Sequence, residues 1–254
     1  MGLVKRIAES GGVQIVLTLL VYTFYAIILG LSLAPAVYFV LYSFNWLIRP
    51  EILSGTLTLK NVFLFSLAIG GAFYIFFISG VLVMSSTIRL LSLGIKPGKY
   101  PAMSVTTLRW LIYSGVYTLA IRLILPLIPM TFFTNIFFRI IGCKMGKNVK
   151  LNTWNLNDAY LLELGDNVIV GGATDISCHL FENYQLILKP IRIGDNTLIG
   201  AHCYISPGVV IGKNCTIGLN SFIRQDKVIP DNTKLTSVSS LNMRDAYRIE
   251  RGKF

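Results

Sequence analysis

Two patterns of apolar and polar residues divide the chain near residue 140. The N-terminal part contains long runs without a charged residue, and the C-terminal part contains apolar residues at a fixed spacing of six. A helix crosses a bilayer with about 20 apolar residues, whereas a short regular repeat is typical of a solenoid. The sequence therefore predicts a membrane domain at residues 1–140, a repeat domain at 141–235 and a C-terminal tail at 236–254.

The first uncharged run covers residues 13–48. It is long enough for two short spans, or for one span and a re-entrant piece, and Pro35 marks the predicted break because proline lacks the helical N–H. Lys5 and Arg6 precede the run as they would in a signal peptide. The run is longer than the apolar region of a signal peptide and more membrane sequence follows, so a retained anchor is expected.

Two more apolar segments follow. Residues 61–88 carry no charge and predict one further span. Residues 110–138 are apolar but are interrupted by Arg122 and by two prolines. This last segment predicts either a poor fourth span or helices that lie in the membrane interface.

The composition fits a membrane protein. Hydrophobic residues make up 54% of the chain and charged residues 14%, with a mean hydropathy of +0.64. These values exclude a disordered chain and a freely soluble enzyme. The two domains share the net charge of +11 unevenly, because residues 1–140 contain only two acidic residues, Glu9 and Glu51.

The basic residues predict the topology. No acidic residue lies between Glu51 and Asp158, and the stretch 89–150 is rich in Lys and Arg. Segments rich in Lys and Arg remain on the cytoplasmic side, which places this stretch there together with Lys5 and Arg6. Both ends of the membrane domain then lie on the same side, so two or four spans are expected. We expect an integral protein, typically of a bacterial inner membrane, with its repeat domain in the cytoplasm. The basic stretch is expected to contact anionic lipid rather than nucleic acid.

The repeat domain has the most specific pattern in the sequence. Isoleucine recurs at 187, 193, 199, 205, 211, 217, 223 and 229, and glycine follows it at four of these positions. A six-residue period predicts a β-helix, in which three hexapeptides make one coil and each isoleucine stacks on the isoleucine 18 residues later. Asn or Gly fills 196, 208, 214 and 220, where tight corners are expected. The period slips between Ile176 and Ile187, which predicts a loop.

This repeat, over residues 145–230, resembles the hexapeptide-repeat acyltransferase superfamily. The resemblance implies a left-handed parallel β-helix that assembles as a homotrimer. It also implies transfer of an acyl group from a thioester, often acetyl-CoA, to a hydroxyl or amine by means of a histidine.

A second resemblance covers more of the chain. The order of membrane segments, the sequence KPGKYP at 96–101, Leu108-Arg109-Trp110, and residues 142–149 before the repeat is similar to the C-terminal region of ε-poly-lysine-synthetase-type peptide synthetases. Those proteins contain tandem acyltransferase-like domains, whereas this chain contains one repeat domain. The substrate therefore does not carry over, and an aminoacyl carrier-protein thioester joins acyl-CoA as an expected donor.

Acyl transfer requires a base near neutral pH, and a histidine suits this role. The chain contains two histidines. His179 lies in the loop that interrupts the repeat and resembles the family's base. Glu182 is the residue expected to orient the imidazole ring, and Asp175 is a second candidate for that role. His202 occupies a corner position and is a weak candidate for the donor site.

Other candidate groups are weaker. Cys178 adjoins His179 and would be a nucleophile in a Cys–His arrangement, but neighbours on a strand point to opposite faces. The pattern of histidines and cysteines predicts no metal site. The sequence thus predicts a membrane-bound acyltransferase with His179 as general base. The alternative is a non-catalytic β-helix scaffold that organises a membrane complex, which would need no break in its repeat.

Overall fold

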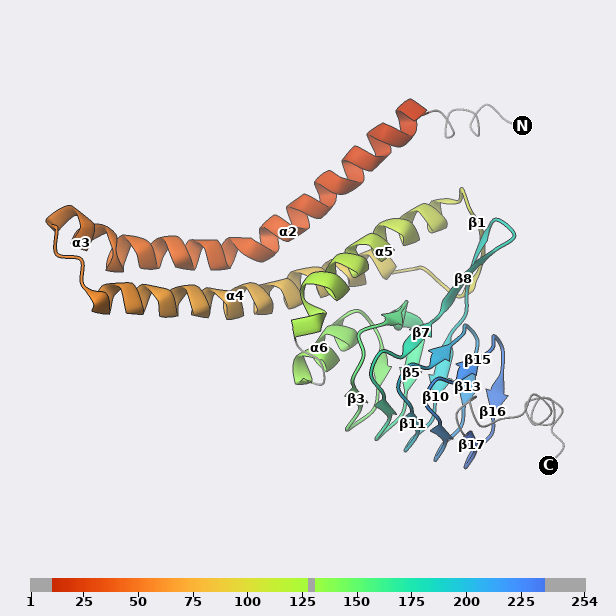
Figure 1. Cartoon of the computed structure of the whole chain (residues 1–254). Helices are drawn as coiled ribbons and strands as arrows, with labels where there is room; N and C mark the ends of the chain where they lie inside the picture. The colour runs from red at the N-terminus through yellow and green to blue at the C-terminus, as the bar shows by residue number, and fades with distance from the viewer. Residues whose placement is uncertain (1–10, 128–130, 236–254) are drawn as a thin grey trace. The chain divides into compact units, whose positions relative to one another are not determined.

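The computed structural model describes residues 11–127 and 131–235 and divides the chain into two compact units at Thr87. The N-terminal unit is helical, and the C-terminal unit contains stacked strands and further helices (Figure 1). Lys5, Arg6, Pro129 and the predicted tail 236–254 lie outside the described residues.

The N-terminal unit contains two long apolar helices, α2 (Gly11–Leu47) and α4 (Leu59–Ser92), and α4 continues into the second unit. The short helix α3 (Arg49–Ser54) lies between them in the sequence. Pro35 lies inside α2, which is one helix of 37 residues, so the predicted break there is wrong. Membrane helices tolerate proline because neighbouring helices, Ser or Thr side chains and local adjustments of the helix satisfy the backbone groups that it frees.

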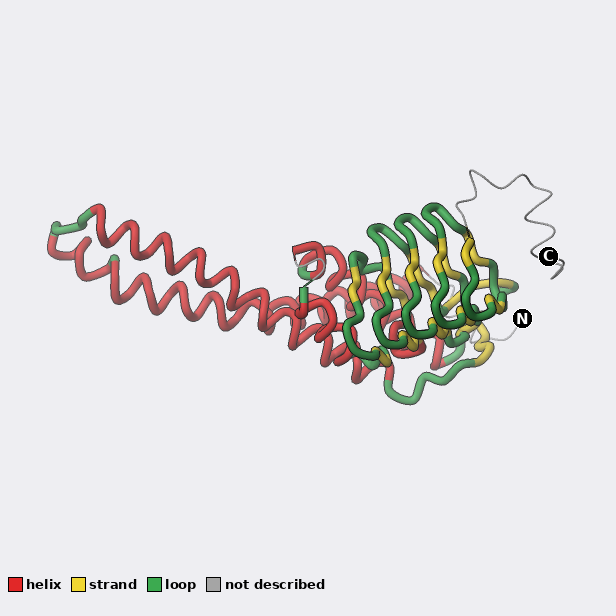
Figure 2. The backbone as a smooth tube through the Cα atoms, turned by 90° about the horizontal axis from the view of Figure 1, so that it is seen from below, coloured by secondary structure: helices red, strands yellow, loops and turns green. Residues whose placement is uncertain are grey.

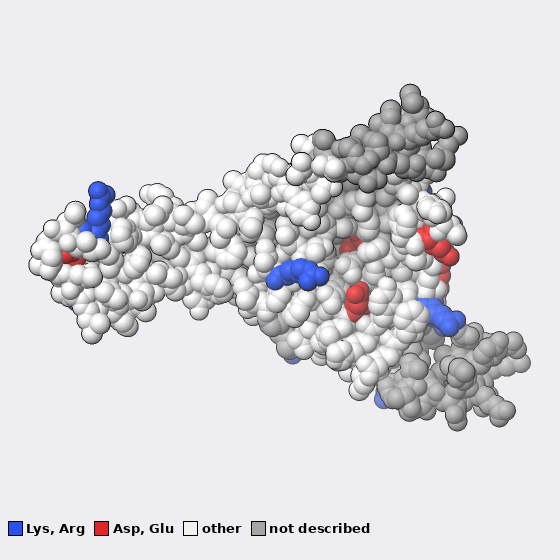
Figure 3. Space-filling view, turned by 45° about the horizontal axis from the view of Figure 1, so that its top comes forward, with Lys and Arg blue, Asp and Glu red and all other residues white. Residues whose placement is uncertain are grey.

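The charged side chains of residues 11–87 gather at one end of this unit. They are Arg49, Glu51 and Lys60, all near the turn between α2 and α4. Figure 3 shows these charges at the tip of the helical arm, and the rest of the arm is uncharged on the face in view. Among the described residues, three segments are long and apolar enough to cross a membrane, at 18–54, 59–92 and 105–127.

Two helices of the second unit precede the coils and pack on them. Helix α5 (Val105–Leu123) begins at Ser104, whose Oγ accepts a hydrogen bond from the Thr107 backbone N–H at 3.1 Å. The hydroxyl of Tyr117 on its buried face donates to the Trp154 carbonyl at 2.7 Å. The short helix η1 (Leu125–Leu127) follows, and then α6 (Phe132–Ile140). In α6 the Asn135 side-chain amide donates to the Val149 carbonyl at 2.8 Å.

The coils form three parallel sheets, as the six-residue period predicts (Figure 2). The first contains β2 (Lys144–Met145), β5 (Leu162–Leu164), β10 (Ile191–Ile193), β13 (Val210–Ile211) and β16 (Val228–Ile229). The second contains β3 (Lys150–Leu151), β6 (Ile169–Val170), β11 (Leu198–Ile199), β14 (Thr216–Ile217) and β17 (Lys234–Leu235). The third contains β4 (Leu156–Asn157), β7 (Asp175–Ser177), β12 (Tyr204–Ile205) and β15 (Phe222–Ile223).

The core of the coils consists of stacked isoleucines. Ile193 pairs with Ile211, which pairs with Ile229, so the predicted stacking distance of 18 residues is confirmed. Each of these side chains is at most 4% exposed. The buried stack stabilises the domain through contacts between neighbouring coils.

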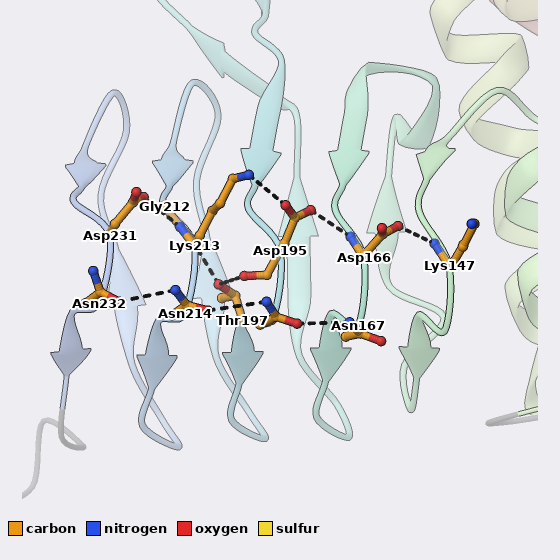
Figure 4. Close-up of polar contacts among 11 residues, drawn as sticks. Lys147, Asp166, Asn167, Asp195, Thr197, Gly212, Lys213, Asn214, Asp231 and Asn232 are labelled. Atoms are coloured by element: carbon orange, nitrogen blue, oxygen red, sulfur yellow. Dashed lines mark hydrogen bonds and ion pairs between the residues drawn. The ribbon is translucent and has the colours of Figure 1, made fainter.

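The corners of the coils carry residues in the left-handed backbone region. Asn196, His202, Asn214 and Asn220 all have φ between +55° and +57°, as expected for positions predicted to be tight corners. The asparagines of one corner also bond to one another along the stack (Figure 4). The Asn196 amide donates to Asn214 at 3.3 Å, and the Asn214 amide donates to Asn232 at 3.2 Å. These ladders satisfy polar corner groups and support the domain structurally.

The glycines after the isoleucines allow a close approach between coils. A Cβ at Gly200 would lie 2.6 Å from the Leu219 backbone nitrogen. We therefore expect Gly200→Ala to lower the free energy of unfolding by about 1–3 kcal/mol, measured by chemical denaturation in detergent. The matched control is Gly172→Ala, whose Cβ would lie 3.2 Å from the Asn152 side-chain amide and 3.7 Å from the nearest backbone atom. Equal stability of the two variants would contradict the close-approach argument.

Candidate active site

The predicted interruption of the repeat is an antiparallel hairpin. It consists of β8 (His179–Glu182) and β9 (Gln185–Leu188), and β1 (Gly98–Pro101) pairs with β9 to complete a three-stranded sheet (Figure 1). Asn183 and Tyr184 connect the strands with φ of +50° and +57°, which is the geometry of a two-residue hairpin turn. Ile187 belongs to β9 rather than to a coil, so its place in the predicted isoleucine series is wrong.

His179 lies at the base of this hairpin and is held by a buried carboxylate. Its Nδ1 is 2.5 Å from Oδ2 of Asp158. The Asp158 side chain is 1% exposed, whereas 28% of the His179 side chain remains accessible. With Nδ1 bonded to Asp158, Nε2 is the ring nitrogen left to exchange a proton with a substrate.

The second oxygen of Asp158 is bonded as well. Nε1 of Trp110, on α5, donates to Asp158 Oδ1 at 2.7 Å. The Trp110 ring also meets the His179 ring edge-on, with centroids 4.8 Å apart and planes at 65°. Both groups therefore fix the orientation of the imidazole, and the two bonds compensate the buried carboxylate for its lost hydration.

Local backbone geometry positions Asp158. Its φ is +56°, and it directly precedes the short helix η2 (Ala159–Leu161). Aspartate is among the few residues other than glycine that adopt this conformation readily. The resulting turn interrupts the coil between β4 and β5 and places the carboxylate beneath the hairpin.

Asp175 and Ser177, on β7, complete the surroundings of His179. Asp175 Oδ1 accepts a hydrogen bond from the Asn157 amide at 3.1 Å. Ser177 Oγ donates to the His179 carbonyl at 3.0 Å. Burial raises the pKa of Asp175, opposed by the Asn157 hydrogen bond and by His179. Asp175, predicted as a second orienting partner, thus acts on His179 through its charge, and no hydrogen bond from it to the ring is recorded among the described residues.

The Asp158 carboxylate dominates the protonation of His179. Burial of the ring opposes its positive charge, but the hydrogen bond to Asp158 and the charges of Asp158 and Asp175 outweigh this and raise the pKa of His179. A raised pKa keeps the ring a strong base, which suits removal of a proton from a weakly acidic hydroxyl or amine.

The raised pKa also makes stability depend on pH. The folded chain holds the His179 proton more tightly than the unfolded chain, whose pKa is near 6.5. The stabilisation is therefore complete below that value and is lost as pH rises through the folded pKa. We expect the unfolding midpoint of the wild type to fall relative to His179→Gln as pH rises from about 6. Thermal unfolding in detergent measures this, and parallel curves for the two proteins would rule it out.

The structure does not bring Glu182 to His179. Glu182 is exposed at the far end of β8, where it pairs with Gln185 beside the turn. Three residues of extended strand separate it from His179 by about 10 Å. Asp158 occupies the place predicted for Glu182. One feature of the sequence indicates Asp158, which is that it ends the long stretch without acidic residues.

The two weaker candidates differ in their exposure. His202 is an exposed corner residue. Cys178 is fully buried, and burial raises the pKa of its thiol well above the ordinary value, so its thiolate is disfavoured. The described residues contain no group of three or more potential metal ligands from His, Cys, Asp and Glu.

The repeat matches known proteins. Residues 190–225 match the family described as the hexapeptide repeat of succinyl-transferase. The chain is 24% identical over 168 residues to a delta-poly-L-ornithine synthetase of Acinetobacter baumannii, covering 66% of this chain and 12% of that protein. It is 36% identical over 103 residues to the galactoside O-acetyltransferase of Escherichia coli, covering 37% of this chain and 49% of that protein.

A solved structure is also similar. A maltose O-acetyltransferase from Clostridium difficile is 19% identical, with a TM-score of 0.39, over 59% of this chain and 90% of the other. This chain covers 12% of the ornithine synthetase and 49% of the galactoside acetyltransferase, so it spans half or less of the length of these two curated relatives. The family match and the two curated relatives confirm the predicted resemblance to hexapeptide-repeat acyltransferases, and one of these relatives is a poly-amino-acid synthetase.

Proposed function

Because its repeat is that of the hexapeptide-repeat acyltransferases, we propose that this chain is a membrane-bound acyltransferase with His179 as its general base. It moves an acyl group from a thioester to a hydroxyl or amine of an acceptor near the membrane. The single observation that carries this proposal is the buried Asp158 carboxylate 2.5 Å from His179 Nδ1. That contact leaves Nε2, on a partly exposed ring, for the substrate.

The proposed reaction uses each group once. Nε2 of His179 takes the proton of the acceptor hydroxyl or amine as the acceptor atom attacks the thioester carbonyl carbon. The carbon–sulfur bond then breaks, and the thiolate leaves with the proton returned by the imidazolium. Asp158 holds the Nδ1–H and stabilises the transient positive charge, while Trp110 holds Asp158.

The proposed donor is acetyl-CoA or a longer acyl-CoA. A carrier-protein thioester is the alternative donor, because it presents the same reactive group. The name of the galactoside O-acetyltransferase supports acetyl transfer to a hydroxyl. The name of the delta-poly-L-ornithine synthetase supports transfer of an aminoacyl group to an amine. The proposal needs no metal, since a histidine base and a thioester leaving group suffice.

The proposed assembly is a homotrimer of left-handed β-helices in a bacterial inner membrane, with the repeat domains in the cytoplasm. Apolar helices and the basic stretch 89–150 support the membrane location. A cytoplasmic repeat domain would meet soluble thioesters, and the membrane domain would bring the acceptor.

Labelled donor tests this function directly. Membranes that contain the wild-type protein, the His179→Ala variant or neither are incubated with acetyl-CoA labelled in the acetyl group, and then with labelled aminoacyl carrier protein. Label that enters a lipid or glycan fraction only with the wild type supports the proposal and identifies the acceptor class. Equal labelling by a folded His179→Ala protein overturns His179 as the base. Wild-type membranes that label no more than membranes with neither protein, with both donors, favour the scaffold.

A further inference from the structure

The second unit exposes large apolar side chains around the His179 hairpin. We call them the docking patch, and they come from the last turn of α4, the start of α5 and the hairpin. Its members are Leu90 (65% exposed), Met103 (62%), Val105 (82%), Leu108 (44%), Phe181 (51%) and Tyr184 (86%). Exposed apolar side chains that cluster in this way indicate a binding surface.

Hydrogen bonds hold the parts of the docking patch together. The Ala102 backbone N–H donates to the Tyr184 carbonyl at 2.9 Å, which fixes the turn before α5 against the tip of the hairpin. Nη2 of Arg109 on α5 donates to the Leu90 carbonyl at 3.1 Å. Phe181 lies two residues from His179 and therefore on the same face of β8. The docking patch thus adjoins the candidate base.

The charges near the docking patch favour an anionic partner. Between residues 88 and 110 the chain carries Arg89, Lys96, Lys99 and Arg109 and no acidic residue. Glu182 is the single acidic residue of the hairpin strands. Exposed apolar side chains flanked by Lys and Arg are the composition of a surface that binds anionic lipid. Leu90 also lies in the last turn of α4, a helix long and apolar enough to cross the bilayer.

Helix α5 is poorly suited to cross a membrane, although its apolar length suffices. The residues between Arg109 and Arg122 rise about 18 Å, whereas the hydrocarbon layer is about 30 Å thick. Trp110 of α5 is also bonded to the Asp158 carboxylate. A transmembrane α5 would place this carboxylate and His179 at the depth of the lipid chains, where charged groups are costly.

We propose that the docking patch inserts into the interfacial layer of an anionic bilayer. Helix α5 then lies on the membrane surface, and only α2 and α4 cross the bilayer. This proposal rests on the membrane location proposed above but not on acyl transfer. It identifies the acceptor class as a molecule presented at the lipid headgroups, since Phe181 and His179 share one face of β8.

Topology gives the first test. Leu57→Cys lies between α3 and α4, Leu219→Cys lies in a coil corner, and both positions are exposed. The four native cysteines are buried, so a membrane-impermeant maleimide reports the introduced thiols, with the parent chain as background. In sealed vesicles the two variants should label from opposite sides, because one span separates them. Labelling from the same side means that α5 also crosses and overturns the proposal.

Depth gives the second test. Spin labels at Tyr184→Cys and Val105→Cys are compared with one at Leu219→Cys in liposomes of phosphatidylglycerol and phosphatidylcholine. The first two should be more accessible to oxygen and less accessible to a water-soluble nickel chelate than the third, more strongly with phosphatidylglycerol. The proposal fails if all three labels behave alike. It also fails if the two patch labels are shielded from both reagents, which indicates a second copy of the chain. Neither readout requires catalysis.

Discussion

Purified His179→Ala protein is expected to transfer acyl groups at about 1/100 to 1/10,000 of the wild-type rate. The variant loses the imidazole, which is the proposed proton acceptor. In the wild type a buried carboxylate holds this ring, with Asp158 Oδ2 at 2.5 Å from His179 Nδ1. Binding of the donor should be little changed, so the loss should fall on kcat rather than KM. Steady-state kinetics with the donor and acceptor identified by labelling measure both constants.

His202→Ala is the matched control for this prediction. It removes the other histidine, which is an exposed corner residue in a different coil. Its kcat should remain within a factor of about two of the wild type, because His202 has no part in the hydrogen bonds that join Trp110, Asp158 and His179. A similar loss in both variants would mean that the effect is structural, and a fully active His179→Ala protein would refute the proposed base.

The regular part of the fold was predictable because its energetics are local. Each isoleucine contacts the equivalent residue one coil away, so the six-residue period in the sequence maps directly onto the stack from Ile193 to Ile229. The hairpin was predictable only as a break in that period. Its pairing with β1 joins segments more than 80 residues apart, and no sequence period records such a contact.

The partner of His179 illustrates the same limit. Glu182 was selected because it is close in sequence, yet an extended strand carries it about 10 Å away. Asp158 precedes His179 by 21 residues and reaches it because both lie near the third sheet, on successive coils. Contacts across coils depend on where insertions enlarge each coil. The turn at Asp158 and the hairpin at His179 are two such irregularities, and the site lies where they meet.

Asp158→Asn is expected to reduce activity by a factor of about 10²–10⁴ and to move the acidic limb of the pH–rate profile to lower pH. The shift follows because the Asp158 charge raises the pKa of His179. The loss follows from hydrogen-bond valence. The carboxylate accepts from Trp110 Nε1 and His179 Nδ1 together, whereas an amide has one oxygen and one NH₂ group. If the oxygen faces Trp110, the NH₂ group faces Nδ1 and forces the proton onto Nε2, which removes the base.

This argument predicts a rescue that a purely structural role would not produce. In the double variant Trp110→Phe with Asp158→Asn, the indole donor is gone, so the amide oxygen is free to accept from His179 Nδ1 and restore the active tautomer. The double variant should therefore be more active than Asp158→Asn alone, although Trp110→Phe by itself lowers activity. Measuring kcat for the wild type and the three variants completes the cycle. Additive losses would show that Asp158 and Trp110 act independently, and the positioning role would then be wrong.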